Sequence, residues 1–228
     1  MATSSTDTIA QSAIPIPVPR TEWTVAQLLD QFGGVPPERV HLAPVPGTAT
    51  EEDLLEMGAQ TGRICELIDG TLVEKTMGYF EAWLAGEILF LIRSYLAQHD
   101  LGIVTGPDGC LRLLPRQVRG PDVAFVRRER LPDGRVPREP IPSLVPSLAV
   151  EVLSKSNTRR EMERKLREYF EAGVNLVWYI EPRTQTATAY TSPDQFTEIG
   201  VDGELDGGEI LPGFRLALKK LFDGPANS

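Results

Sequence analysis

The sequence predicts a mixed α/β domain in which helices flank a central sheet. Two stretches, 148–153 and 175–180, have the near-continuous apolar character of strands buried on both faces. Two longer stretches, 79–98 and 158–173, carry apolar residues at helical spacing. Because strand and helix patterns alternate along a chain of 228 residues, we expect one mixed α/β domain with appendages.

The first elements are short. Thr24 is a candidate helix cap and Gly33 a candidate stop, which predicts a helix over 24–33. A proline-rich irregular segment follows, and a second short helix is expected over 50–57. The stretch 65–74 predicts a hairpin, because Asp69-Gly70 is a preferred tight-turn pair.

The middle of the chain contains the longest predicted helix, over 79–98. Its apolar residues recur at helical spacing and define one core-facing side: Leu84, Ile88, Leu91, Ile92 and Tyr95. Short strands at 103–104 and 111–114 bracket a Gly-Pro-Asp-Gly turn at 106–109. A strand begins at Asp122 and runs through Val126, and the polar segment 127–145 is expected to be an exposed loop.

The second half contains the strand 148–153 and then a helix with a capping box at Thr158 and Glu161. That helix is expected to stop near Gly173, before the strand 175–180 and a hairpin containing 186–190. These features give a domain prediction of four parts. They are a disordered tail over 1–20, a helical and irregular extension over 21–62, a core over 63–192 and a packed C-terminal extension over 193–228.

Composition restricts the functional classes. An apolar fraction of 41% supports a real core, and no apolar run reaches the length of a membrane span. Cys65 and Cys110 lack zinc-site spacing and are expected to be buried free thiols. Because residues 1–20 also lack a secretory pattern, we expect a cytoplasmic protein.

The net charge of −9 argues against a general nucleic-acid binder, but the charges are unevenly distributed. The segments 110–139 and 154–167 each carry a net +4. We expect five arginines of these segments to face phosphates: Arg112, Arg116, Arg119, Arg159 and Arg160. The alternative is that these arginines form a solvated surface.

Two acids stand alone inside strongly apolar strands. Asp122 precedes Val-Ala-Phe-Val, and Glu151 lies within Leu-Ala-Val-Glu-Val-Leu. Buried carboxylates are costly without compensation, and a divalent cation between them would supply it. Hard oxygen ligands favour Mg²⁺ or Mn²⁺. The alternatives are a strand-entry cap for Asp122 and a buried salt bridge with an arginine for Glu151.

The order of motifs resembles the Uma2 family, a restriction-endonuclease-like branch of the PD-(D/E)XK nuclease superfamily. The resemblance covers roughly 65–190. It depends on Pro121-Asp122-Val123, on Val150-Glu151-Val152-Leu153-Ser154, on the stretch 165–174 and on Leu-Val-Trp-Tyr-Ile-Glu-Pro at 176–182. It implies a restriction-endonuclease-like core, a DNA substrate, a Mg²⁺-dependent phosphodiester hydrolysis and possible homodimers.

The resemblance also implies roles for particular residues. Asp122 and Glu151 are expected to bind the metal, with the carbonyl of Val152 as a further ligand. The superfamily lysine two residues after the second acid is replaced here by Leu153, and in Uma2-like proteins it stands on the following helix, which favours Lys165. Glu81, at the start of the long helix, is expected to be an auxiliary catalytic acid.

Each assignment has an alternative. Lys165 flanks the apolar stripe of its helix, so its stem alone could cover apolar surface while its ammonium reaches water. Lys155 is a second candidate for the catalytic lysine, and Glu66 is a further acid. Glu81 also suits the positive N-terminal end of a helix. The alternative function is a catalytically silent member of the fold that acts as a nucleic-acid-binding or interaction module.

Overall fold

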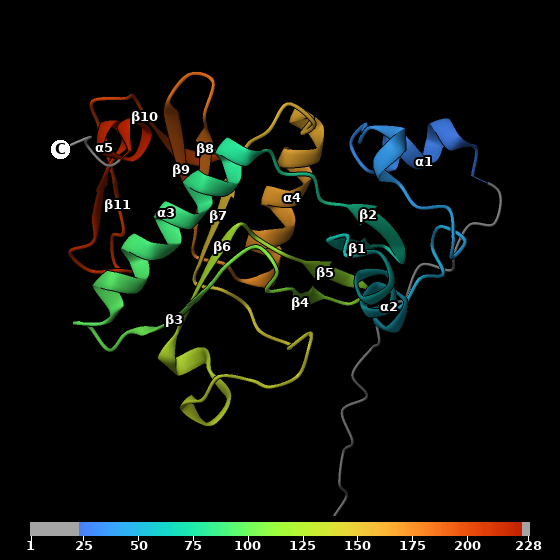
Figure 1. The fold of residues 1–228 in the computed structure, drawn as a ribbon, viewed down its shortest axis with the longest axis horizontal. Coiled ribbons are helices and arrows are strands. Elements are labelled where there is room, and N and C mark those ends of the chain that lie inside the picture. The colour runs from blue at the N-terminus through green and yellow to red at the C-terminus, as the bar shows by residue number, and fades with distance from the viewer. Residues whose placement is uncertain (1–22, 225–228) are drawn as a thin grey trace, which may run out of the picture.

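A computed structural model describes residues 23–224, and the predicted tail over 1–20 lies outside this range. Helices and strands alternate as expected (Figure 1). The helices are α1 (Val25–Gln31), α2 (Glu51–Thr61), α3 (Tyr79–Leu96), α4 (Arg159–Ala172) and α5 (Leu218–Asp223). Short 3-10 helices span Pro37–Arg39, Arg128–Arg130 and Pro132–Gly134. None of the helices between residues 23 and 224 combines the length and apolarity needed to cross a bilayer.

A six-stranded mixed sheet forms the centre of the molecule, in the order β10-β9-β8-β7-β6-β3. Its β7 and β8 are parallel and its other neighbouring pairs are antiparallel. Its strands are β3 (Gly102–Thr105), β6 (Val123–Arg127), β7 (Leu148–Val152), β8 (Leu176–Glu181), β9 (Thr186–Ser192) and β10 (Gln195–Ile199). The predicted mixed α/β fold class is confirmed, and the sheet continues past residue 192 into β10.

A four-stranded antiparallel sheet lies beside it, in the order β2-β1-β5-β4. Its strands are β1 (Cys65–Ile68), β2 (Thr71–Glu74), β4 (Leu111–Leu114) and β5 (Gln117–Arg119), and a separate pair joins β11 (Glu204–Asp206) to β12 (Arg215–Ala217). The predicted Asp69-Gly70 turn joins β1 to β2, and both residues have positive φ, 49° and 73°, as a tight hairpin turn requires.

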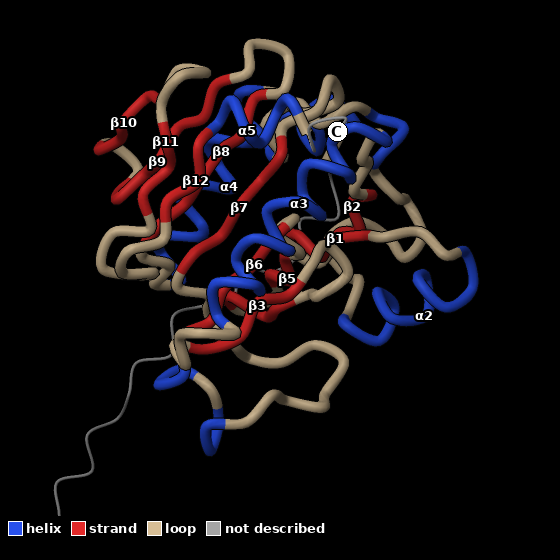
Figure 2. Tube along the Cα trace, turned by 60° about the vertical axis from the view of Figure 1, so that its left-hand side comes forward, coloured by secondary structure: helices blue, strands red, loops and turns tan. Residues whose placement is uncertain are grey.

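The strands on either side of the 106–109 turn do not pair with each other. β3 pairs with β6 in the large sheet, whereas β4 pairs with β5 in the small one. The local sequence pattern does not indicate which strand β3 or β4 pairs with, because the choice of partner depends on long-range packing. This crossing of the chain from one sheet to the other brings β1 and β5 close to α4 (Figures 1 and 2).

The two faces of the six-stranded sheet carry different helices (Figure 2). Leu148, Val150 and Val152 of β7 pack in the cluster that contains the buried side of α3. Ala149, on the opposite face, packs in the cluster that contains Met162 of α4. Since side chains alternate along a strand, Glu151 lies on the α4 face, where its register partner is Tyr179 of β8.

The start of α4 is fixed by contacts with the N-terminal segment. Thr158 and Glu161 form the predicted capping box, and α4 ends at Gly173, which has a positive φ of 98°. The Thr158 hydroxyl donates to the carbonyl of Gly33 at 2.6 Å. Arg39 is buried and donates to both carboxylate oxygens of Glu161, at 3.0 and 2.8 Å. These contacts fix the position of the start of α4.

Candidate functional site

Asp122 and Glu151 lie on the α4 face of neighbouring strands. Asp122 comes directly before β6, which pairs with β7 through Val123 and Val150. Oδ2 of Asp122 accepts a hydrogen bond of 2.6 Å from the backbone amide of Val152. Asp122 is 2% exposed and Glu151 4% exposed, so both carboxylates depend on internal partners rather than on water. The structure therefore brings these two predicted residues together.

Lys165 is the nearest cation to Glu151. Its Nζ lies 2.8 Å from Oε1 of Glu151 and 3.0 Å from Oε1 of Glu66. The sequence predicts a lysine at the margin of the apolar stripe of α4, but Lys165 is 5% exposed and lies within the buried face. Its ammonium therefore neutralises two carboxylates inside the protein and does not reach water.

Glu66, which the sequence offers only as a further acid, belongs to the same cluster. It lies in β1 and is 5% exposed. Its carboxylate accepts hydrogen bonds from Arg119 at 2.7 Å and from the amide of Gly120 at 3.1 Å. The signal was present, because Glu66 is a lone acid between Cys65 and Leu67 in a short apolar strand, which is the pattern that singled out Glu151.

Lys75 is a second lysine of the site, and sequence reasoning missed it. It follows β2, and its Nζ lies 2.7 Å from Oδ1 of Asp122 while donating to the carbonyl of Gly120 at 2.5 Å. At this distance the ammonium neutralises Oδ1, which has no hydrogen-bond partner among the described residues. No spacing indicates Lys75, since it stands in an irregular connection between a strand and a helix.

The charges perturb one another. Burial raises the pKa of Glu66, but the nearby Lys165 and Arg119 outweigh it and hold that pKa well below the usual range. Burial raises the pKa of Glu151, and here Lys165 only partly offsets the combined effect of burial and Asp122. Burial also raises the pKa of Tyr169, whose hydroxyl donates to Oε1 of Glu151. The nearby cations therefore compensate Glu151 less fully than Glu66.

The prediction that Arg119 faces phosphates is wrong. Arg119 is 2% exposed, and its guanidinium binds Glu66 and Glu168 in the interior. Arg164 continues the chain of charges, because it lies 2.7 Å from Glu168 and 2.7 Å from Asp69. A buried arginine that has two carboxylate partners stabilises the position of Glu66 and cannot contact a ligand at the surface.

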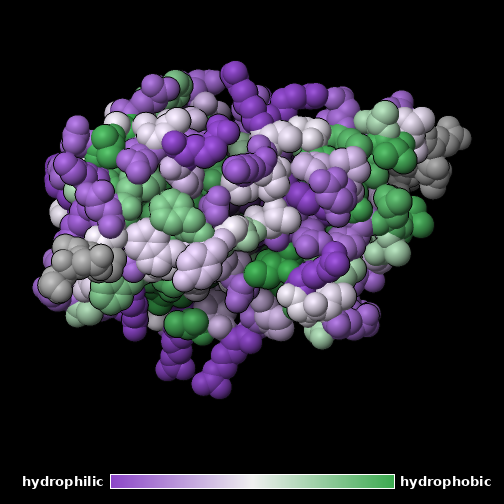
Figure 3. Space-filling model, turned by 45° about the horizontal axis from the view of Figure 1, so that its top comes forward, coloured by the Kyte–Doolittle hydropathy of each residue, from purple (hydrophilic) through white to green (hydrophobic). Residues whose placement is uncertain are grey.

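The other predicted phosphate-facing arginines lie nearer the surface, each beside a partner. Arg112 binds Glu51, Arg159 lies 2.8 Å from Glu163, and Arg160 lies 2.7 Å from Asp30. Arg116 contacts backbone carbonyls. Exposed pairs such as those of Arg159 and Arg160 are weak and exchange readily with other ions. Figure 3 shows that hydrophilic side chains cover most of the face drawn there.

Three further predicted residues have different surroundings. Val152 directs its amide at Asp122, and since the amide and carbonyl of one strand residue point to the same side, its carbonyl faces that side too. Glu81 folds back over Gly78 at the start of α3. A Cβ added to Gly78 would lie 2.2 Å from Oε2 of Glu81. No hydrogen bond or ion pair within 23–224 joins Glu81 to Asp122 or Glu151, and its place in the first turn of α3 suits the helix dipole. Lys155 is exposed, and no ion pair in this range joins it to either acid.

Hard oxygen donors therefore converge on one side of β7. In the described part of the chain, no group of three or more His, Cys, Asp or Glu side chains is arranged to hold a metal ion. The oxygen groups on this side that could hold a cation are the carboxylates of Asp122 and Glu151 and the backbone carbonyl of Val152. Oδ1 of Asp122 faces the ammonium of Lys75 at 2.7 Å, so a cation bound at this oxygen would have to displace that ammonium.

The comparisons with known proteins agree with this architecture. A crystal structure described as that of a putative nuclease belonging to DUF820 from Anabaena variabilis ATCC 29413 has the same fold, with a TM-score of 0.66. The identity is 18%, over 76% of this chain and 97% of that one. No curated protein matches the chain. The family model of Uma2, described as a putative restriction endonuclease, matches residues 51–219. Since that match spans more than half of the sequence, the chain belongs to the Uma2 family.

Proposed function

We propose that this protein is a DNA endonuclease that hydrolyses phosphodiester bonds with a bound Mg²⁺ or Mn²⁺ ion. The observation that carries the proposal is the convergence of Asp122, Glu151 and Lys165 on the α4 face, in a chain of the Uma2 family. A site of two carboxylates and a carbonyl has the hard-oxygen chemistry that these ions prefer. When bound, such an ion would activate a water molecule and stabilise the charge that develops on the phosphate.

The residues of the chain divide the remaining tasks. Asp122 and Glu151, with the carbonyl of Val152, would hold the ion. Lys165 favours the ionised form of Glu151, because its ammonium lies 2.8 Å from that carboxylate. Lys75 is the more accessible of the two lysines, with a side chain 10% exposed against 6%, so its ammonium is better placed to meet a phosphate.

A catalytically silent nucleic-acid-binding module is the second candidate, and one observation favours it. Lys75 pairs with Asp122, and Lys165 pairs with Glu151, so each carboxylate has an internal cation without any metal. A protein that uses these pairs only for stability would retain the fold and lose the reaction.

Nicking of supercoiled plasmid by the purified protein separates the two functions. The enzyme hypothesis predicts nicking with Mg²⁺ or Mn²⁺ and none with a chelator. Asp122→Asn and Glu151→Gln should each lower the rate by at least about a hundredfold, since each removes a ligand charge. Asp108→Asn, which changes an acid in the 106–109 turn, is the matched control and should cut like wild type. Plasmid that stays intact with every ion would favour the silent module.

A further inference from the structure

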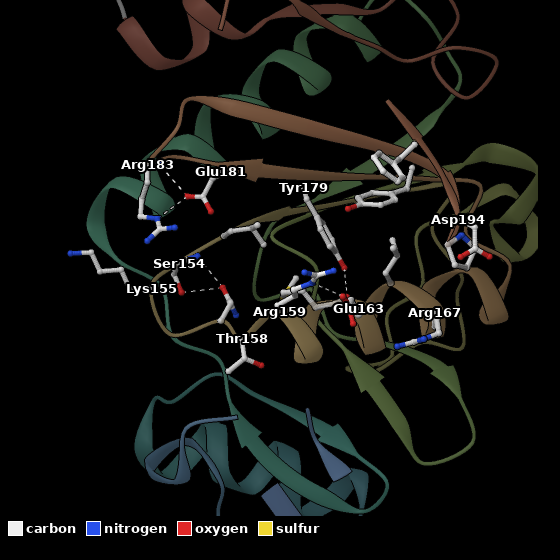
Figure 4. A pocket seen from close by; sticks show the side chains of 17 residues that line it. Ser154, Lys155, Thr158, Arg159, Glu163, Arg167, Tyr179, Glu181, Arg183 and Asp194 are labelled. Atoms are coloured by element: carbon white, nitrogen blue, oxygen red, sulfur yellow. Dashed lines mark hydrogen bonds and ion pairs between the residues drawn. The ribbon is translucent and has the colours of Figure 1, made fainter. Parts of the chain in front are cut away.

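A cleft of about 850 Å³ is lined in part by α4, and none of the residues of the proposed metal site lines it. It is formed by α4, the ends of β7 and β8, and the β9–β10 hairpin (Figure 4). Its volume lies within the range of small-molecule sites, which is about 300–1,000 Å³. It is therefore large enough for one nucleotide.

The cleft and the cluster of charges lie on different flanks of α4, and they approach each other at the end of β7. Leu153, which lines the cleft, is two residues after Glu151 along the chain, a distance of about 7 Å in an extended strand. Met162 and Leu166 line it as well, and on α4 they flank Lys165. A strand with a phosphate at the Glu151 end of β7 would thus cross the 153–158 connection to place a base in the cleft.

Aromatic rings line one side of the cleft. The ring centroids of Tyr179 and Tyr190 are 5.3 Å apart, and those of Tyr190 and Phe196 are 5.6 Å apart. Phe196 is 55% exposed, so the face of its ring is accessible to a ligand in the cleft. The face of a nucleobase is a suitable cover, because bases stack on aromatic side chains regardless of their identity.

Basic side chains stand at the two ends of the cleft. Figure 4 shows Lys155 near one end and Arg167 near the other, with Tyr179 between them. Both basic residues are exposed, and neither has an ion-pair partner among residues 23–224. Arg159 and Arg183 also line the cleft, beside Glu163 and Glu181. Cations on both sides of an aromatic wall suit a base that has a phosphate on either side.

We propose that this cleft binds an unpaired nucleobase of a nucleic-acid strand, with the flanking phosphates at Lys155 and Arg167. The inference rests on the proposed function, because it assumes a nucleic-acid substrate. It adds that the substrate has a single-stranded or locally unpaired segment beside the cut. A base within a duplex is stacked and paired on both sides, and it cannot enter the cleft without leaving the helix.

Fluorescence anisotropy tests the proposal with a labelled twelve-residue oligothymidylate, the same strand in a duplex, and free thymidine monophosphate. Calcium replaces magnesium so that binding is measured without cleavage. Wild type should bind the single strand more tightly than the duplex. Phe196→Ala should weaken single-strand binding about fivefold or more, the equivalent of one lost stacking contact. Arg167→Gln should weaken it as well and reduce its dependence on salt.

Phe90→Ala is the matched control, since Phe90 is 63% exposed on α3, away from the cleft. It should bind like wild type. Unchanged single-strand affinity in Phe196→Ala, an equal loss on the duplex, or binding of the free nucleotide alone would overturn the proposal. The plasmid assay keeps the two hypotheses apart. Oligonucleotide binding that depends on Phe196, without any nicking, would support the cleft and reject the nuclease. Plasmid nicking together with unchanged oligonucleotide binding in Phe196→Ala would support the nuclease and reject the cleft.

Discussion

Replacing Lys165 with methionine removes an ammonium from between two buried carboxylates and keeps most of the apolar stem. In the wild type the ammonium lies 2.8 Å from Glu151 and 3.0 Å from Glu66, and all three side chains are 6% exposed. Removal of one partner from a buried ion pair costs about 3–5 kcal/mol, because the remaining charge has no partner. For a domain of this size the melting temperature should fall by roughly 2–4 °C per kcal/mol, or about 6–20 °C in total.

The loss should also depend on pH in a defined direction. Lys165 lowers the pKa of both Glu66 and Glu151, so its removal raises both values in the folded state. A carboxyl group with a raised pKa in the folded state stabilises the protein at low pH and loses that effect as the pH rises through the folded value. The difference in unfolding free energy between Lys165→Met and wild type should therefore be smaller at pH 5 than at pH 7.5.

Urea denaturation at these two pH values measures both effects. Lys219→Met changes an exposed lysine on α5 and should leave stability within about 0.5 kcal/mol of wild type. Glu66→Gln combined with Lys165→Met removes one of the two repelling charges and should recover part of the loss. A Lys165→Met protein as stable as wild type, or one that loses stability equally at both pH values, would refute the account of Lys165 as an internal counter-ion.

Two other predictions concern single side chains. Lys75→Met should bind Mg²⁺ or Mn²⁺ roughly tenfold more tightly than wild type, a difference of about 1.4 kcal/mol in binding free energy. The reason is that the ammonium 2.7 Å from Oδ1 of Asp122 competes with a cation there. A thermal-shift titration would measure the affinity, and an unchanged affinity would contradict the prediction. Burial raises the pKa of the Cys65 and Cys110 thiols to about 11, so at pH 8 only about one thiol in a thousand is ionised. Both should react slowly with iodoacetamide until the protein unfolds, and rapid labelling of the folded protein would contradict the raised pKa values.

Much of the local structure could be predicted from the sequence, because local signals determine it. The capping box at Thr158 and the stop at Gly173 give the bounds of α4, and Asp69-Gly70 gives the β1–β2 turn. The pairing of strands could not be predicted in this way. β5 has only three residues, and its partners come from 50 residues earlier and from the preceding strand.

The candidate site likewise contains residues that could be predicted from the sequence and residues that could not. A lone acid in an apolar strand predicts a buried carboxylate, and this reasoning found Asp122 and Glu151. Lys75 and the interior position of Arg119 depend on how the two sheets pack together, which the spacing of residues does not encode. Charge counts were also misleading, because a positively charged segment can direct an arginine inward at carboxylates from other elements.

Calorimetric titration of the purified protein with Mn²⁺ and Mg²⁺ tests the central claim most directly. The account predicts saturable binding of the ion by the wild type, and loss of that binding in Asp122→Asn and in Glu151→Gln. Asp108→Asn should bind as the wild type does. The midpoint of thermal unfolding should rise with ion concentration only in proteins that bind, by mass action on the folded state. Absence of binding in the wild type, or equal binding in Asp122→Asn, would contradict the claim that these two carboxylates form a metal site.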